Sequence, residues 1–249
     1  MGTVTSLLLA LVVLAYLAAG GRWMLSHPMF TLRLIVAEGE VTRNNELTLK
    51  ANVVPHLSGN LFTLDLVRAR EVFEAVPWVR SAIVHREFPD RLRVLLREQH
   101  PQALWGDEGG STLLNEQGQV FEANLGEVEA DALPRLKGPA SQSQQVLEMY
   151  QTLRPVLLAV DMDIDELVLS PRGSWRVLTT QGAVIELGRG QPQELVSLLQ
   201  EFLRTLPQIA SRYERTPKSL LMADLRHKDG YALRLQGVTT TEGDARKKP

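Results

Sequence analysis

An uncharged N-terminal segment is the strongest constraint on how this 249-residue chain can fold. Residues 1–21 contain no charged side chain, and the run from Leu7 to Leu17 is almost continuously aliphatic. A helix of this length, rising about 1.5 Å per residue, spans about 31 Å, which matches a hydrocarbon core of roughly 30 Å. Arg22 and Trp23 follow, at the depth where cationic and aromatic side chains anchor a span at the membrane surface. The segment therefore predicts a membrane-spanning helix.

Two other interpretations of this segment are a cleavable signal peptide and a buried helix. A signal peptide starts with a positively charged region, but the α-amino group is the one positive charge before Val4. The segment Ala18-Ala19-Gly20 is also a poor cleavage site. We therefore expect residues 1–25 to be a retained membrane anchor. The nearby cations, Arg22 and Arg33, follow the span, so the positive-inside rule alone favours a cytoplasmic body.

Composition excludes several classes of function. The chain has no cysteine, so it has no disulfide, thiolate zinc site or thiol nucleophile. Its net charge of −2 gives no support for a nucleic-acid partner, since nucleic-acid binding usually leaves a basic footprint.

The segment 59–101 predicts a helix, a strand, a tight turn and a second strand. Pro77 ends the helix, because the residue before a proline is pushed out of the α region. Thr63 and Asp65 precede the helix as candidate capping residues. Strand-like alternation follows in 79–84 and again in 91–97. The apolar stripe of the helix comprises Leu66, Ala69, Phe73 and Val76.

The residues before this segment complete a small domain. Residues 30–36 are apolar and β-branched enough for a strand, 37–40 predict a turn, and 42–57 carry a weaker helical face broken at Pro55. The order strand, helix, helix, strand, strand allows two helices to cover one face of a three-stranded mixed sheet.

Beyond Pro101 the pattern changes to short strands with interspersed helices. We expect a β-rich mixed domain with flanking helices, followed by a polar tail that is disordered. The expected strands are 103–106, 113–115, 133–138, 164–170, 175–180, 183–187, 220–226 and 231–235, and the expected helices are 141–159 and 192–209.

Local signals for catalysis, cofactors or metals are weak, and we predict no catalytic, cofactor-binding or metal-binding residues and no small-molecule substrate. The acidic run 161–166 resembles the start of a calcium loop, but Glu166 and Arg172 occupy the positions that need glycine and glutamate. A solvated acidic loop is therefore favoured. The segment 188–190 lacks the third glycine of a pyrophosphate-binding turn, and the five histidines are scattered singly.

Two surfaces are candidates for protein binding. Arginines concentrate in the segment 80–97, where they either dock an acidic protein segment or lipid headgroups, or simply form a solvated face balanced by acids. The last hairpin, 220–235, either completes the sheet or leaves an open edge that accepts another chain by β-augmentation. The docking candidates of the first surface are Arg80, Arg86, Arg91 and Arg93.

Alternation predicts which side chains of the last hairpin face the core. In its first strand we expect Leu221, Ala223 and Leu225 to face inward, and Met222, Asp224 and Arg226 to face outward. In its second strand Tyr231, Leu233 and Leu235 share one face.

Four short motifs carry a family resemblance. With one N-terminal span and the strand order above, the chain resembles the FtsQ family of bacterial cell-division proteins, and its first soluble unit resembles a POTRA domain. The segment 103–106 resembles the start of the family's second, β-rich domain, and 223–226 with Gly230 resembles its C-terminal segment. The motifs are Gly59-Asn60-Leu61-Phe62, Val76-Pro77-Trp78-Val79, Phe88-Pro89-Asp90-Arg91-Leu92 and Glu98-Gln99-His100-Pro101.

The resemblance implies an essential, non-enzymatic scaffold of the divisome that links early and late division proteins at the septum. It implies a periplasmic body, an inner-membrane anchor with a very short cytoplasmic N-terminus, and binding to FtsB and FtsL in a ternary complex. These implications override the charge count. The implied organisation is an α+β chain with an anchor (1–25), a β-α-α-β-β POTRA domain (29–98), a mixed β domain (99–236) and a disordered tail (237–249).

The resemblance also implies which residues hold a partner. In the family, the C-terminal strand receives a strand from FtsB, and Arg226 would contact an acidic FtsB side chain. The family often has tyrosine where this chain has His227. The implied partner-binding residues are Met222, Asp224, Arg226, His227, Gly230, Tyr231 and Leu233. The alternatives are a POTRA-type component of outer-membrane assembly or secretion, which would need tandem POTRA domains or a barrel, and a membrane-anchored periplasmic hydrolase.

Overall fold

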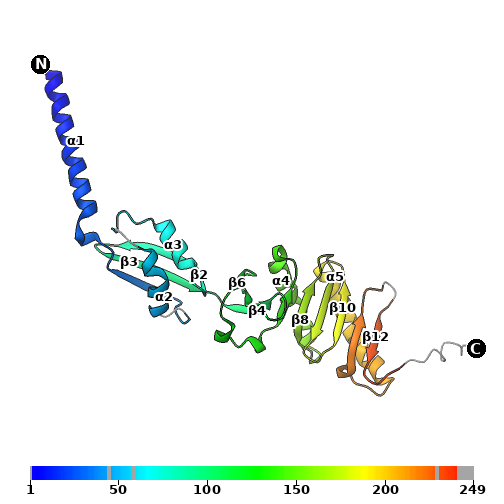
Figure 1. The fold of residues 1–249 in the computed structure, drawn as a ribbon. Helices are drawn as coiled ribbons and strands as arrows, with labels where there is room; N and C mark the ends of the chain where they lie inside the picture. The colour runs from blue at the N-terminus through cyan, green and yellow to red at the C-terminus, as the bar shows by residue number, and fades with distance from the viewer. Residues whose placement is uncertain (1, 44–45, 58–59, 228–229, 240–249) are drawn as a thin grey trace, which may run out of the picture. The chain divides into compact units, whose positions relative to one another are not determined.

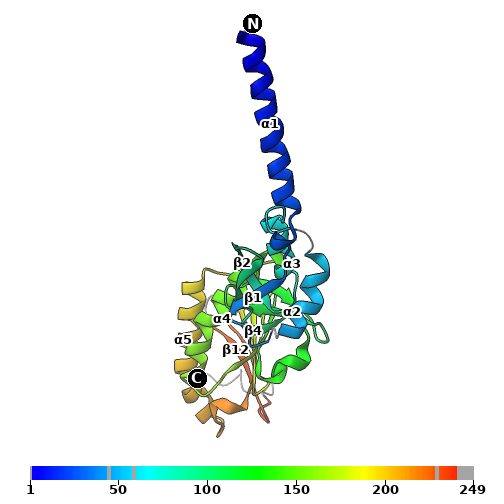
Figure 2. The same cartoon turned by 90° about the vertical axis from the view of Figure 1, so that its left-hand side faces the viewer.

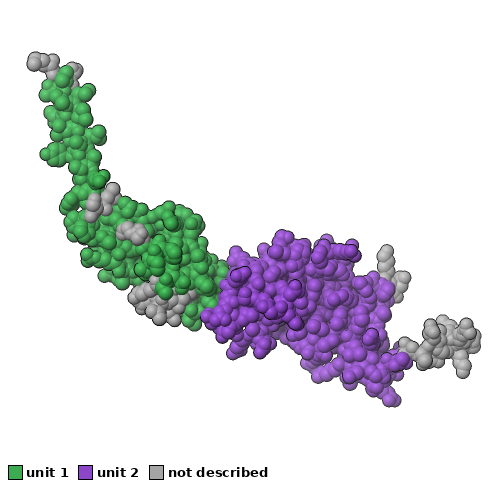
Figure 3. All heavy atoms as spheres, viewed as in Figure 1, with its two compact units in different colours: residues 1–99 green, residues 100–249 purple. Residues whose placement is uncertain are grey.

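The computed structural model divides into two compact units, residues 1–99 and 100–249 (Figure 3). The structure describes the chain except residues 1, 44–45, 58–59, 228–229 and 240–249, so most of the tail expected at 237–249 lies outside the described residues (Figure 1).

The first unit begins with the apolar helix α1 (Gly2–Ser26). Its segment Val4–Met24, 21 residues with a mean hydropathy of 2.2, is long and apolar enough to span a membrane, and none of it is buried within the protein. The predicted N-terminal helix is thus confirmed.

The rest of this unit is a three-stranded sheet covered by short helices. The sheet has the order β1-β3-β2, with β1 parallel and β2 antiparallel to the central strand. The strands are β1 (Leu34–Gly39), β2 (Val79–Glu87) and β3 (Arg91–Glu98), and the helical elements are η1 (Pro28–Phe30), α2 (Glu46–Val53), η2 (Val54–His56) and α3 (Leu66–Glu74).

The local sequence explains α3 and β3 well. The Asp65 carboxylate caps α3 by accepting the Val67 and Arg68 amides at 2.8 and 3.3 Å. Thr63, the other candidate cap, instead donates its hydroxyl to the Asn60 carbonyl. The alternating side chains Leu92, Val94 and Leu96 are all buried against the helices, with at most 1% exposed.

Two strands differ from the predicted pattern. The first strand starts at Leu34 rather than Phe30, because residues 28–30 form a 3₁₀ turn, and it continues to Gly39, through the region expected to turn. In β2, a bulge between Val79 and Ser81 shifts the alternation, so Ile83 is exposed while Ala82 is buried. Periodicity does not reveal such a bulge, because it inserts one residue into an otherwise regular strand.

The second unit contains one nine-stranded mixed sheet in the order β12-β11-β10-β9-β8-β7-β4-β5-β6. The strands are β4 (Pro101–Trp105), β5 (Thr112–Asn115), β6 (Val120–Glu122), β7 (Arg135–Lys137), β8 (Ile164–Leu169), β9 (Trp175–Thr179), β10 (Val184–Gly188), β11 (Leu220–Asp224) and β12 (Ala232–Leu235). The 3₁₀ turns are η3 (Leu125–Glu127), η4 (Ala130–Ala132), η5 (Ala140–Gln142) and η6 (Pro217–Ser219).

Two long helices, α4 (Ser143–Leu158) and α5 (Pro192–Ser211), lie along the same face of this sheet (Figure 2). Their apolar stripes, including Leu153 and Leu199, share one core with inward-facing strand residues such as Val177 and Ile185. The predicted fold class, an α+β chain with an apolar helix, a POTRA-like unit and a mixed β-sheet domain, is confirmed.

Candidate functional site

Among the residues that the structure describes, strand β12 lies at one end of the nine-stranded sheet and pairs only with β11, antiparallel (Figure 1). The last hairpin therefore does present an edge, which was one of its two interpretations. An edge strand offers a row of backbone donors and acceptors to another chain.

The register shows which backbone groups of β12 face outward. The Gln236 amide donates to the Ser219 carbonyl at 2.8 Å, and the extra residue of the hairpin's bulge lies on β11, so alternation along β12 is uninterrupted. In an antiparallel pair, alternate residues bond to the neighbour. Ala232 and Arg234 therefore direct their amides and carbonyls toward β11, and Leu233 directs its own toward the open edge.

The bulge also corrects the prediction for β11. It falls between Leu220 and Met222, so Leu220 is buried and Leu221 is 41% exposed, although Leu221 was expected to face the core. Ala223 and Leu225 are buried and Met222 is exposed, as predicted.

Tyr231 and Leu233 share one face, as predicted, and that face packs on the core. The Tyr231 ring contacts the Phe202 ring of α5 edge-on at 5.0 Å, and its hydroxyl hydrogen-bonds the Thr205 hydroxyl. These two side chains therefore support the hairpin from inside, while Ala232 and Arg234 are exposed on the opposite face.

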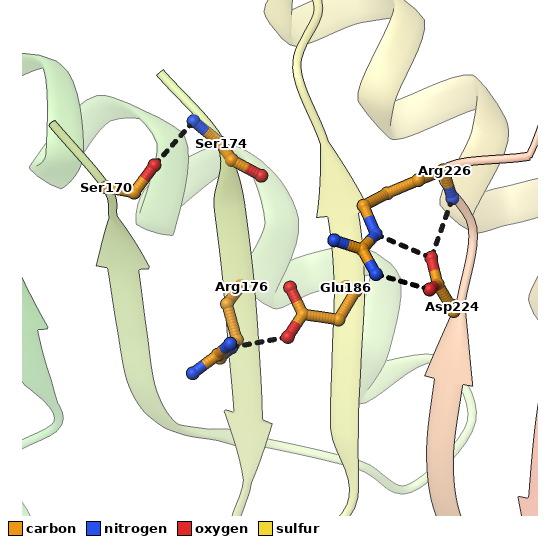
Figure 4. A network of polar contacts seen from close by, with 6 residues as sticks. All are labelled: Ser170, Ser174, Arg176, Glu186, Asp224 and Arg226. Carbon is orange, nitrogen blue, oxygen red and sulfur yellow. Dashed lines mark hydrogen bonds and ion pairs between the residues drawn. The ribbon is translucent and has the colours of Figure 1, made fainter. Parts of the chain in front are cut away.

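Asp224 and Arg226 form an ion pair at the end of β11 (Figure 4). The Arg226 guanidinium donates to the two carboxylate oxygens, from Nε at 2.8 Å and from Nη2 at 2.6 Å. These bonds lower the pKa of Asp224 to about 2 and raise the pKa of Arg226. A guanidinium has five N–H donors, so the pair leaves donors for a further acceptor.

A second ion pair extends this network across the sheet. Arg176 of β9 donates from Nε to Glu186 of β10 at 2.6 Å, and Glu186 is the register partner of both Arg176 and Asp224. Figure 4 shows the two pairs on the same side of neighbouring strands. The two carboxylates Glu186 and Asp224 thus lie side by side on β10 and β11, and each has its own arginine partner.

The ends of these strands, together with Leu198 of α5, border an open basic pocket of about 650 Å³. Its cations are Arg172 of the β8–β9 turn, Arg189 after β10, and Arg226, with His227 beside them. The Ser174 amide donates to the Ser170 hydroxyl at 2.9 Å and orders the turn that carries Arg172. The pocket and Arg226 suit an anionic group such as a carboxylate.

Sequence reasoning singled out Arg226 and His227 but missed Arg172 and Arg189 as site residues. Both follow the end of a strand in a turn, at Pro171-Arg172-Gly173 and Gly188-Arg189-Gly190, which was the available signal. Gly230, with φ +155, is exposed before β12, and residues 228–229 of the hairpin turn lie outside the described residues.

The arginines of the first unit do not form one surface. Arg86 points to the helix-covered face, where Nε and Nη2 donate to the Leu61 and Leu64 carbonyls, both at 2.6 Å. Arg93 instead pairs with Glu87 at 3.0 Å and Glu38 at 3.8 Å, and Arg91 lies 3.9 Å from Asp90. Arg80 is half-buried. The docking role of these arginines stays a prediction.

The acidic loop before β8 forms an ion pair with a side chain of α4. Arg154 donates two hydrogen bonds to Asp163, each 2.9 Å, and Asp163 also accepts the Ile164 amide. These bonds lower the pKa of Asp163. Within the part of the chain that the structure describes, no group of three or more histidine, aspartate or glutamate side chains is placed to hold a metal ion.

Comparisons with known proteins match both units. Residues 32–99 match the model "POTRA domain, FtsQ-type", and residues 103–226 match "Cell division protein FtsQ/DivIB, C-terminal". The chain is 39% identical over 230 residues to cell division protein FtsQ of Thiomonas arsenitoxydans, covering 92% of this chain and 84% of that protein. It is 36% identical to FtsQ of Burkholderia pseudomallei over 245 residues, covering 98% and 95%, and 36% identical to FtsQ of Bordetella pertussis over 249 residues, covering 93% and 89%.

Proposed function

Because this chain belongs to the FtsQ family of non-enzymatic cell-division proteins, we propose that it is an inner-membrane scaffold that holds FtsB through the open edge of β12. In this proposal α1 spans the inner membrane once, and the body lies in the periplasm at the division septum. The scaffold binds FtsB and FtsL as a ternary complex and so links early and late division proteins.

The observation that carries the proposal is the open outer edge of β12, which belongs to the same hairpin as Arg226 of the basic pocket. A segment of FtsB that pairs with β12 forms two backbone hydrogen bonds with Leu233, whose outward amide donates and whose outward carbonyl accepts. Such backbone bonds give affinity for any extended segment, and side-chain contacts give specificity.

The basic pocket supplies the specificity. The partner strand lies two strand spacings, roughly 10 Å, from β11, whose end carries Arg226. An acidic FtsB side chain that reaches back across β12 can bind the remaining guanidinium donors of Arg226, and Arg172 and Arg189 add positive charge to the same pocket. Met222, Asp224 and His227 lie around this contact, whereas Tyr231 and Leu233 hold β12 in place from the core side.

The experiment is a binding titration of the FtsB periplasmic segment with the detergent-solubilised full-length protein. Arg226→Glu removes a charge-assisted hydrogen bond, which contributes about 1.5–3 kcal/mol, and should weaken binding at least roughly tenfold. Arg204→Glu makes the same charge change on the exposed face of α5 and should leave affinity unchanged. Equal binding by both variants would remove Arg226 from the interface.

The alternative, a POTRA component of outer-membrane assembly or secretion, explains less. It accounts for the match of residues 32–99 to a POTRA domain, but not for the match of 103–226 to the FtsQ/DivIB C-terminal model.

A further inference from the structure

Five aromatic side chains lie in ring-to-ring contact where the membrane helix meets the POTRA unit. We call them the aromatic row. Trp23 at the end of α1 contacts His27 at 4.7 Å between ring centroids, and His27 contacts Phe30 at 6.4 Å. Phe30 contacts Phe62 at 4.8 Å, and Phe62 contacts Phe88 at 5.3 Å.

Backbone hydrogen bonds hold the loops that carry the aromatic row. The Phe30 carbonyl accepts the Leu61 amide at 2.7 Å, and Thr31 forms a β-bridge with Asn60, so the chain leaving α1 is tied to the loop of Phe62. The Asp90 carbonyl accepts the Arg33 amide at 3.0 Å, which ties the same chain to the β2–β3 turn that carries Phe88. The three segments therefore form one bonded tip on the POTRA unit.

This tip exposes apolar surface that packing within the protein does not explain. Trp23 is 66% exposed, Met29 55%, Phe88 57% and Leu34 45%. A group of exposed large apolar side chains marks an interaction site more often than scattered single ones do. The group is continuous with the span Val4–Met24, because Trp23 belongs to both.

The chemistry of the tip fits the lipid headgroup layer. Aromatic rings are enriched at the boundary between hydrocarbon and water, where one part of the ring is apolar and its surroundings are wet. Arg33 and Arg91 flank the turn that carries Phe88, and Glu87 and Asp90 balance their charge, so the exposed rings and apolar side chains, and not a net positive charge, favour the headgroup layer.

We propose that the aromatic row seats the tip of the POTRA unit in the headgroup layer of the membrane that α1 spans. The Phe88 ring and Leu34 side chain contact lipid, and the row connects them to Trp23. This contact holds the POTRA unit against the bilayer, so that the unit does not swing freely about residues 25–29. The proposal does not depend on FtsB binding.

The absence of cysteine allows a direct test with single-cysteine spin labels in the full-length protein in lipid nanodiscs containing phosphatidylglycerol. Labels replace Phe88, Leu34 or Ile83. The label at position 34 leaves the Phe88 ring intact. This label therefore reports on the tip even if the Phe88→Cys substitution perturbs the structure of the tip. Ile83 is the control, because it is 45% exposed but lies five residues from Phe88 along β2, about 16 Å away.

For each label, two collision rates are measured and compared. One is the rate with oxygen, which partitions into lipid, and the other is the rate with a nickel chelate, which stays in water. Labels at 88 and 34 should collide severalfold more with oxygen relative to nickel than the label at 83. Equal, water-like values at all three positions would overturn the proposal. Equal, lipid-like values at all three would also overturn it, because contact would then not be confined to the tip. No division partner is present in these discs, so a partner protein cannot account for protection from nickel at 88 and 34.

Discussion

At the scale of single residues, the missing side chain of Gly188 leaves the space that the Arg226 side chain occupies. Gly188 has φ +83, and a Cβ built there would stand 2.9 Å from the Arg226 Cγ. A left-handed backbone strains any residue with a Cβ, and here the side chain would also displace the guanidinium stem. The close approach therefore makes Gly188 part of the site although it contributes no polar group.

We predict that Gly188→Ala weakens FtsB binding and that Gly182→Ala does not. Gly182 has the same φ of +83, but its Cβ would meet nothing within 4 Å. Both variants should lose about 1 kcal/mol of unfolding free energy from backbone strain. Chemical denaturation and a binding titration separate the two effects, and equal affinity of the two variants would show that the position of Arg226 does not matter.

The Asp224 carboxyl should titrate at a pKa of about 2 in the folded protein, because the Arg226 guanidinium stabilises its charged form. The folded pKa is lower than the unfolded value near 3.9, so the pair's stabilisation is present above about pH 4 and is lost as pH falls through about 2. Carbon-detected NMR titration measures this directly. Arg226→Ala should return the pKa of Asp224 toward its ordinary value, and an ordinary pKa in the unaltered protein would contradict the ion pair.

At the scale of elements, α3 depends on a single cap. Asp65→Ala should lower the unfolding free energy of the POTRA unit by about 1 kcal/mol, because the Val67 and Arg68 amides lose their acceptor. Thr63→Ala is the control, because the Thr63 hydroxyl bonds the Asn60 carbonyl and no first-turn amide. Urea unfolding of the two variants tests the assignment, and a larger loss for Thr63→Ala would reverse it.

Sequence periodicity predicts regular helices and strands but not strands that contain a bulge. The helical stripe of α3 and the alternation of β3 are regular, so their elements could be located from sequence. The bulges near Val79 and Leu220 each add one residue to a strand, and this reverses the side-chain direction beyond them. Leu221 was assigned to the wrong face for this reason.

At the scale of the whole molecule, the two units have separate cores. One apolar cluster includes Phe73, which is fully buried, and the other includes Phe202, which is 1% exposed. Phe73→Ala should destabilise the POTRA unit by about 3–5 kcal/mol and leave the second unit's transition in place, and Phe202→Ala should do the reverse. Calorimetry of the full-length protein would show this as a shift in one of two transitions. A single transition moved equally by both changes would contradict separate cores.

Tertiary arrangement also explains why the candidate site was predicted only in part. Arg226 could be found because it belongs to a motif at the end of the chain. The turns that carry Arg172 and Arg189 could be located, but their approach to Arg226 could not, because it depends on the antiparallel pairing of β9 with β8 and β10 and on the parallel pairing of β10 with β11. Parallel strands can lie far apart in sequence, so local patterns do not reveal such neighbours.

The central claim is that FtsB adds a strand to β12, and amide hydrogen exchange at Leu233 and Arg234 tests it most directly. The Leu233 amide faces the open edge, while the Arg234 amide is already bonded to β11 in the register set by Gln236 and Ser219. On addition of the FtsB segment, exchange at Leu233 should slow by at least about tenfold, and exchange at Arg234 should change little. If the segment binds and exchange at Leu233 stays as fast as in the free protein, the edge of β12 is not where FtsB is held.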